Sequence, residues 1–238
     1  MSALDQLLLV QERDAAIDVL AHRRDAHPCR AALRDAAASL AAIEARLVGA
    51  RAARDDVAAR QAALESDASA AATRAAEIDK RLYSGMVSAS RDLVSMGEEI
   101  KHLKARQADL EDHAIEAMEE VEPLNAEVER LESERARIME HRANVAAELA
   151  AAEAELDADI ERERAGRAVL LVDVPADLVL TYDRLRQRSA GVGAARLVGG
   201  SCTGCHLSLP SAEVERLKRL PADEVVFCDQ CGRILVHS

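Results

Sequence analysis

Large aliphatic side chains recur at alternating spacings of three and four in two long stretches of the chain. In the first stretch, residues 33–82, eight of them follow this repeat and only Val48 departs from it. In the second, residues 93–156, thirteen follow it. The exceptions there are Val94, Ile115, Met118 and Met139. A seven-residue apolar repeat is typical of helices that pair as a left-handed coiled coil.

A short polar stretch at residues 83–92 separates these two seams. It contains Gly85 and three serines, which favour turns and caps over helix interior. Seams of similar length on either side of a turn indicate an antiparallel hairpin, because each arm supplies the apolar face that the other lacks. The alternative, a parallel dimer of two chains, requires one helix through Gly85. We predict a coiled-coil hairpin over residues 1–165 with its tip at 83–92, and a helix break at His27 and Pro28.

The heptads end at Gly166, and the pattern changes after it. Pro175 suits the first turn of a short helix, within a connecting segment at residues 166–190. Residues 191–238 alternate short apolar runs with turn residues. In that region we expect strands at 194–198, 224–227 and 234–236, and a short helix capped by Ser211. The predicted fold class is mainly α, a long antiparallel coiled-coil helical hairpin followed by a small β domain.

Four cysteines of this last domain form two Cys-x-x-Cys pairs, the most specific chemical pattern in the chain. They are Cys202, Cys205, Cys228 and Cys231. Two such pairs supply four thiolates for one tetrahedral ion, and Zn²⁺ is the ion most often held in this way. Iron, disulfides and a redox dithiol are the alternatives. We predict a C4 zinc ribbon with one structural zinc, in which Gly232 allows a tight turn and leaves its backbone N–H free to point at a thiolate.

A closed site of four protein ligands has no open position for water, so metal-assisted catalysis is not expected. The sequence also has no Gly-rich phosphate loop and no Ser/His/Asp arrangement. We therefore expect a protein that is not an enzyme and has no small-molecule substrate. Because a module of about 45 residues is too small to fold by its apolar residues alone, we expect zinc removal to unfold it and spare the helical hairpin.

Composition and charge narrow the classes of partner. Aromatic residues are 1% of the chain and charged residues 31%, which is typical of long helices. The net charge is -12, and residues 1–165 carry 22 basic against 35 acidic residues. This balance disfavours helices that wrap a phosphate backbone. The sequence has neither a membrane-spanning apolar run nor a signal-peptide pattern, so we expect a soluble cytoplasmic protein without a membrane partner.

Three segments carry a resemblance to a known family. They read LYSG at residues 82–85, KHLKARQADLED at 101–112 and FCDQCGRIL at 227–235. In these segments the chain resembles the bacterial C4-type zinc-ribbon proteins that have a long N-terminal coiled coil. The resemblance covers most of the chain and implies a helical hairpin with a ribbon at its base, and a nucleic-acid-binding activity.

Basic residues in two places are candidates for contact with nucleic acid or with a protein partner. In the ribbon these are Arg196, Arg216, Lys218, Arg219 and Arg233; at the tip they are Arg81 and Arg91, with Tyr83 as a stacking ring. The ribbon also contains five acidic residues, so it has no evident electrostatic footprint for nucleic acid. Two hypotheses follow: an adaptor that binds RNA or DNA, or a scaffold in transcription or translation that binds another protein without contacting nucleic acid.

Overall fold

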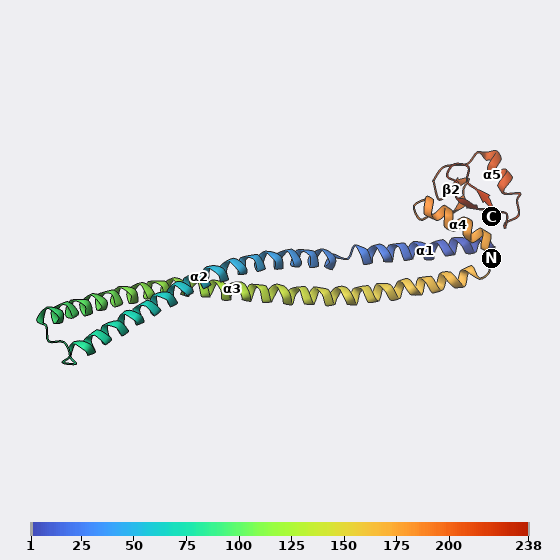
Figure 1. Cartoon of the computed structure of the whole chain (residues 1–238). Coiled ribbons are helices and arrows are strands. Elements are labelled where there is room, and N and C mark those ends of the chain that lie inside the picture. Colours follow the sequence, from blue (N-terminus) through green and yellow to red (C-terminus); the bar gives the residue numbers. More distant parts are fainter. Residues whose placement is uncertain (1, 238) are drawn as a thin grey trace. The chain divides into compact units, whose positions relative to one another are not determined.

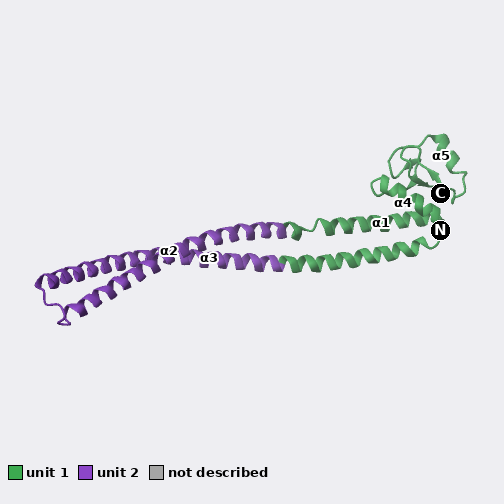
Figure 2. Ribbon diagram, in the orientation of Figure 1, with its two compact units in different colours: residues 1–31, 145–238 green, residues 32–144 purple. Residues whose placement is uncertain are grey.

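The computed structural model describes residues 2–237, which divide into two compact units (Figure 2). Unit 1 contains Met1–Ala31 and Val145–Ser238, and unit 2 is Ala32–Asn144. Three long helices dominate the chain (Figure 1). They are α1 (Ala3–Asp25), α2 (Pro28–Leu82) and α3 (Ser90–Leu171). Among the residues described, no helix is both long and apolar enough to cross a membrane.

In unit 2, helices α2 and α3 form the predicted antiparallel coiled coil. The seam residues turn inward, and one cluster of the core consists of Ile43, Leu47, Val128 and Leu131. Ion pairs between the two helices show that the helices run antiparallel. The residue number of the α3 partner decreases as the residue number of the α2 partner increases. These pairs are Arg46 with Glu127, Arg60 with Glu120, and Arg74 with Glu99. The pairs are exposed, so the buried seam rather than the ions holds the helices together.

The turn between α2 and α3 follows from its composition. Helix α2 ends at Leu82 and α3 begins at Ser90. Gly85 has a φ of 75°, in the left-handed region that glycine tolerates best. The Ser84 hydroxyl donates to the carbonyl oxygen of Arg81 at 2.7 Å, which satisfies one of the last free carbonyls of α2. The chain therefore reverses where glycine and serine are concentrated.

In unit 1, α1 lies along the C-terminal part of α3, and α4 (Ala176–Arg188) packs against them. The contact between α1 and α3 carries ion pairs such as Arg13 with Glu163 at 2.9 Å. Leu4, Leu7 and Val10 of α1 are buried with Leu178 and Tyr182 of α4. This core also receives residues from the C-terminal sheet, so the sheet and the helices fold as one unit.

The sheet has four strands in the order β2-β1-β4-β3. They are β1 (Ala194–Val198), β2 (Ser201–Cys202), β3 (Val226–Phe227) and β4 (Ile234–Val236), with α5 (Ser211–Leu217) between β2 and β3. Strand β1 pairs parallel with β4, and the outer pairs are antiparallel. Sequence patterning missed β2, and it was wrong about Ser211, which is the first residue of α5 rather than its cap.

Alternation along β1 and β4 gives this sheet two buried faces. Ala194 and Ile234 lie in the core formed with α1 and α4. Their neighbours Ala195 and Leu235 lie in a second core with Cys202, Cys228 and residues of α5. Successive residues of a strand point to opposite faces, so two adjacent strands serve both cores at once.

A buried carboxylate ties three helices together in unit 1. Asp14 of α1 is only 4% exposed. It accepts hydrogen bonds from the Tyr182 hydroxyl at 2.9 Å and from Arg167 Nε of α3 at 2.8 Å, and Arg186 of α4 lies 3.7 Å away. Burial, together with the adjacent carboxylate, raises the pKa of Tyr182 far above its usual value. The tyrosine therefore keeps its proton and serves as the donor.

We predict that Asp14→Asn lowers the free energy of opening of α4 by about 1.5–3 kcal/mol, because it removes a buried charged acceptor and leaves Arg167 and Arg186 with only their more exposed carboxylate partners. Asp18→Asn is the matched control on the same helix. Asp18 accepts from Arg186 at 2.6 Å but is half-exposed, so its loss costs less than about 1 kcal/mol. Native-state hydrogen exchange of the α4 amides measures both effects. Equal effects of the two substitutions would contradict a central role for Asp14.

Candidate metal centre

The four predicted ligand cysteines meet in one place between the ends of the ribbon strands. Their sulfur atoms all lie within 4.8 Å of one another. The sulfur of Cys202 is 4.0 Å from that of Cys231, and Cys205 is 3.9 Å from Cys228. Four sulfurs around a zinc ion at the usual Zn–S distance form a tetrahedron with edges of about 3.8 Å. The arrangement fits one structural Zn²⁺.

The two cysteine knuckles have the same backbone shape. In each, the residue after the second cysteine donates its N–H to the carbonyl oxygen of the first: His206 to Cys202 at 2.8 Å, and Gly232 to Cys228 at 2.7 Å. Both donors have a positive φ, 62° for His206 and 70° for Gly232. The second knuckle thus uses glycine in the left-handed region, whereas the first places a histidine there.

The predicted bond from the Gly232 N–H to a thiolate is wrong, because the knuckle turn itself uses that N–H. Instead, the N–H of Gly204 lies 3.4 Å from the Cys202 sulfur. A Cβ at Gly204 would meet the Cδ atom of Arg233 at 2.7 Å. Arg233 in turn donates to the carbonyl oxygens of Val192 and Ser189. The Arg233 side chain therefore lies against Gly204 of the first knuckle and connects the metal site to the segment that contains Ser189 and Val192.

The four thiols have unequal environments. Burial raises the pKa of Cys202, and it raises that of Cys228 to about 12. Burial also opposes ionisation of Cys231, but the backbone N–H and side chain of Arg233 outweigh it and lower its pKa to about 7. A bound zinc ion supplies the positive charge that keeps all four sulfurs as thiolates. Four thiolates complete a closed tetrahedron, so the centre fits a structural role.

The fold and the cysteine centre define the class of protein. The sequence profile of the CT398-like coiled coil hairpin domain matches residues 10–190, and that of the C4-type zinc ribbon domain matches residues 201–235. The chain belongs to the family of CT398-like coiled-coil hairpin proteins with a C4-type zinc ribbon. The resemblance seen in the sequence is thereby confirmed as to family and fold.

Individual relatives match over nearly the whole length. The uncharacterized proteins MT2288 and Rv2229c of two Mycobacterium tuberculosis strains are 30% identical over 231 residues, covering 97% of this chain and 94% of each relative. A solved structure from Mycobacterium smegmatis has a TM-score of 0.85 and 26% identity, covering 99% of this chain and 97% of its own. The structure of CT398 from Chlamydia trachomatis has a TM-score of 0.69 and 16% identity, and the match covers 99% of this chain and 98% of that chain. The last likeness concerns the fold alone.

The structure separates the predicted binding residues into engaged and free groups. Arg196 pairs with Asp5, Arg216 with Glu213, and Lys218 with Glu215. Arg233 is the half-buried support of the metal site. Arg219 of the ribbon, and Arg81 and Arg91 of the hairpin tip, make no ion pair within residues 2–237. Tyr83 at the tip is 80% exposed.

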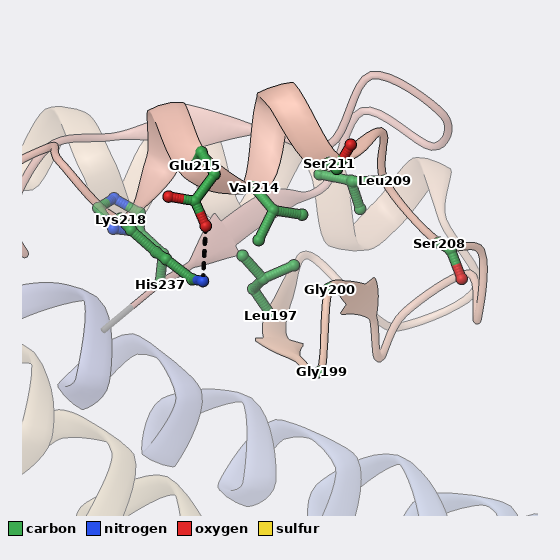
Figure 3. Close-up of a pocket in the computed structure, with 10 residues that line it drawn as sticks. All are labelled: Leu197, Gly199, Gly200, Ser208, Leu209, Ser211, Val214, Glu215, Lys218 and His237. Atoms are coloured by element: carbon green, nitrogen blue, oxygen red, sulfur yellow. Dashed lines mark hydrogen bonds and ion pairs between the residues drawn. The ribbon is translucent and has the colours of Figure 1, made fainter.

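A cavity that sequence patterning did not reveal lies on the ribbon between β1 and α5 (Figure 3). Its volume is about 490 Å³. Leu197 and Val214 face each other across it, and Leu209 adds to the same apolar lining. The ion pair of Lys218 with Glu215 lies at its edge at 2.9 Å. No sequence signal marks this cavity, because its lining comes from four separate segments of residues 197–237.

The unequal knuckles give a testable difference in stability. Gly232→Ala forces a Cβ into the left-handed region and should destabilise the zinc-bound ribbon by about 1–2 kcal/mol. Nothing lies within 4 Å of a Cβ built at Gly232, so this cost is conformational. His206→Gly relieves the same strain in the first knuckle and should stabilise the ribbon by up to about 1 kcal/mol. Hydrogen exchange of the β4 amides measures both, and a loss of stability in His206→Gly would refute the explanation.

Proposed function

We propose that this protein is a non-enzymatic adaptor that binds other proteins through its zinc ribbon. The observation that carries the proposal is the cavity between β1 and α5, in which Leu197, Leu209 and Val214 form an apolar patch bordered by polar side chains. The aliphatic patch gains free energy when a partner takes it out of water, and the one lysine at its edge is already paired with Glu215. A cavity of this size suits one or two apolar side chains of a protein partner.

The charges of the ribbon support the same choice. Nucleic-acid affinity depends on cations that are free to replace counterions at phosphates. Three of the five basic residues of the ribbon already have carboxylate partners, and Arg233 donates to two backbone carbonyls. Of these five, Arg219 alone has neither an ion pair nor a side-chain hydrogen bond within residues 2–237. One free cation is a weak basis for binding a phosphate backbone.

The metal centre contributes shape rather than chemistry in this proposal. Cys202 and Cys228 belong to the core that also contains Leu209 and Leu217. Zinc bound to the thiolates therefore holds in place the segments that line the cavity. Since the four cysteines fill the coordination sphere, the proposed role of the ion is to maintain a docking surface.

Nucleic-acid binding at the hairpin tip is the second candidate. It is favoured by Arg81 and Arg91, which lack ion-pair partners within residues 2–237, and by the exposed ring of Tyr83 between them in sequence. A ring and free cations are the groups that stack on bases and contact phosphates. This candidate belongs to unit 2 and is independent of the ribbon cavity.

The test compares two matched valine substitutions in the full-length, zinc-loaded chain. Val214→Lys places a charge in the cavity, whereas Val225→Lys places the same charge on an exposed site of the ribbon outside it. Protein partners recovered from a nuclease-treated cell extract should be lost with Val214→Lys and retained with Val225→Lys. Zinc content, measured by mass spectrometry of the native protein, shows that both variants keep the metal.

Titration of the chain with RNA and DNA across a salt series tests the second candidate, nucleic-acid binding at the hairpin tip. Two results together would assign the function to the tip instead. Nuclease treatment would remove all partners, and the log–log salt slope of nucleic-acid binding would flatten in Arg81→Ala and Arg91→Ala. Equal retention of partners by the two valine variants would remove the cavity from the proposal. Absence of nucleic-acid binding at low salt is the result that we expect.

A further inference from the structure

Five large apolar side chains stand exposed on the helices of unit 2, and all share one position relative to the seam. They are Val48, Val94, Ile115, Met118 and Met139, between 45% and 70% exposed. Each directly follows a residue of the buried seam, as Val48 follows Leu47. These are the same residues that depart from the heptad repeat of the sequence. The five residues that depart from the heptad repeat are therefore not scattered, because each occupies the position directly after a seam residue.

Helix geometry places this pattern on one side of the coiled coil. Successive residues of an α-helix are rotated by about 100°, so a residue that follows the seam lies beside it. In an antiparallel pair, the residues that follow the seam on both helices come to the same side. We call this side of unit 2 the open flank, and the side formed by residues that precede the seam the paired flank.

The two flanks differ in how they are covered. Ion pairs between α2 and α3 bridge the paired flank at Arg46 and Glu127, Arg60 and Glu120, and Arg74 and Glu99. Every one of these residues directly precedes a seam residue. The open flank instead carries the five exposed apolar side chains, with small residues such as Ala58 and Ala108 between them. On the open flank two such pairs, Arg51 with Glu132 and Arg135 with Glu44, lie near Val48, and no ion pair between the helices covers the part around Ile115 and Met118 within the described residues.

Two grooves lie on the open flank. One, of about 580 Å³, is lined by Glu44, Leu47, Val48, Arg51, Glu132 and Arg135. The other, of about 500 Å³, includes Ala68, Ala72, Ala114 and Ile115. From residue 44 to residue 72, the part of α2 that lines them is about 42 Å long. That is the length of a helix of four heptads.

The charge of the open flank defines the occupant. Between residues 44–69 and 108–132, its acidic members outnumber its basic members by seven to one. The acidic residues are Glu44, Asp55, Glu65, Glu111, Glu122, Glu129 and Glu132, and the basic one is Arg51. Arg51 is itself paired with Glu132. An apolar stripe bordered by carboxylates complements a helix with an apolar stripe bordered by lysines and arginines.

We propose that the open flank binds a basic amphipathic helix of a protein partner as a third helix of the coiled coil. The inference rests on the proposed adaptor function and adds to it a second docking surface and the chemistry of its partner. The thioether of Met118 suits this role, because flexible, polarizable side chains adapt to different apolar partners. A second copy of this chain is a poorer occupant, since its own open flank would bring carboxylates against carboxylates.

The test uses a designed four-heptad peptide with leucines at its apolar positions and lysines beside them. A twin peptide carries glutamates in place of the lysines. Calorimetric titration into the full-length, zinc-loaded chain should give one lysine peptide per chain. The glutamate twin should bind at least tenfold more weakly. Ile115→Lys with Met118→Lys should weaken the lysine peptide at least tenfold, because the pair removes apolar surface and adds repulsion.

The matched control is His102→Lys with His113→Lys, which introduces two lysines on the paired flank of the same helix. It should change the affinity less than twofold. Failure of the lysine peptide to bind, equal binding of its twin, or equal losses in both double variants would overturn the proposal. So would a dimer in sedimentation that Ile115→Lys with Met118→Lys dissociates, because the occupant would then be a second copy. The Val214→Lys comparison involves unit 1 only and decides the adaptor function separately.

Discussion

The parallel pairing of β1 with β4 is the interaction on which unit 1 depends. Because side chains alternate along a strand, Ala194 and Ile234 enter the core with α1 and α4, while Ala195 and Leu235 enter the core around the cysteines. Both cores thus take buried residues from these two strands. Five residues in β1 and three in β4 bury too little surface to persist alone, so the metal and the helices must hold them from opposite faces. The expectation that zinc removal spares the helices therefore applies to unit 2, and not to α1 and α4.

Unit 2 depends on a different constraint, the seven-residue repeat of its seam. The repeat fixes which residues of α2 and α3 are buried, and thereby which residues form each flank. Ion pairs bridge the paired flank along its length, whereas the open flank has such pairs only near Val48 and otherwise presents apolar and acidic residues. Such pairs contribute little to stability, but their position decides which surface stays accessible. In the proposed function both units present surfaces to partners: the cavity of the ribbon in unit 1 and the open flank in unit 2.

The sequence predicted those features whose signal is local or periodic. The heptad seam, the turn at Gly85 and the two cysteine pairs each follow from spacing alone, and the structure contains them. It could not predict the partners of Asp14, because Arg167 and Tyr182 are more than 150 residues away and nothing marks Asp14 among the other helix acids. The ion pair of Arg196 with Asp5 and the ribbon cavity were missed for the same reason. Each depends on which distant segments meet.

The central claim is that the metal centre and the helices of unit 1 fold together through β1 and β4. The chain has two tyrosines, and they report on it separately: Tyr182 is fully buried in unit 1, and Tyr83 is 80% exposed in unit 2. Nuclear magnetic resonance of the full-length chain with labelled tyrosine, recorded with zinc bound, removed and restored, follows both rings. The account predicts that the Tyr182 signal moves to its unfolded position on zinc removal and returns with zinc, while Tyr83 does not change. An unaltered Tyr182 signal in the metal-free protein would contradict it.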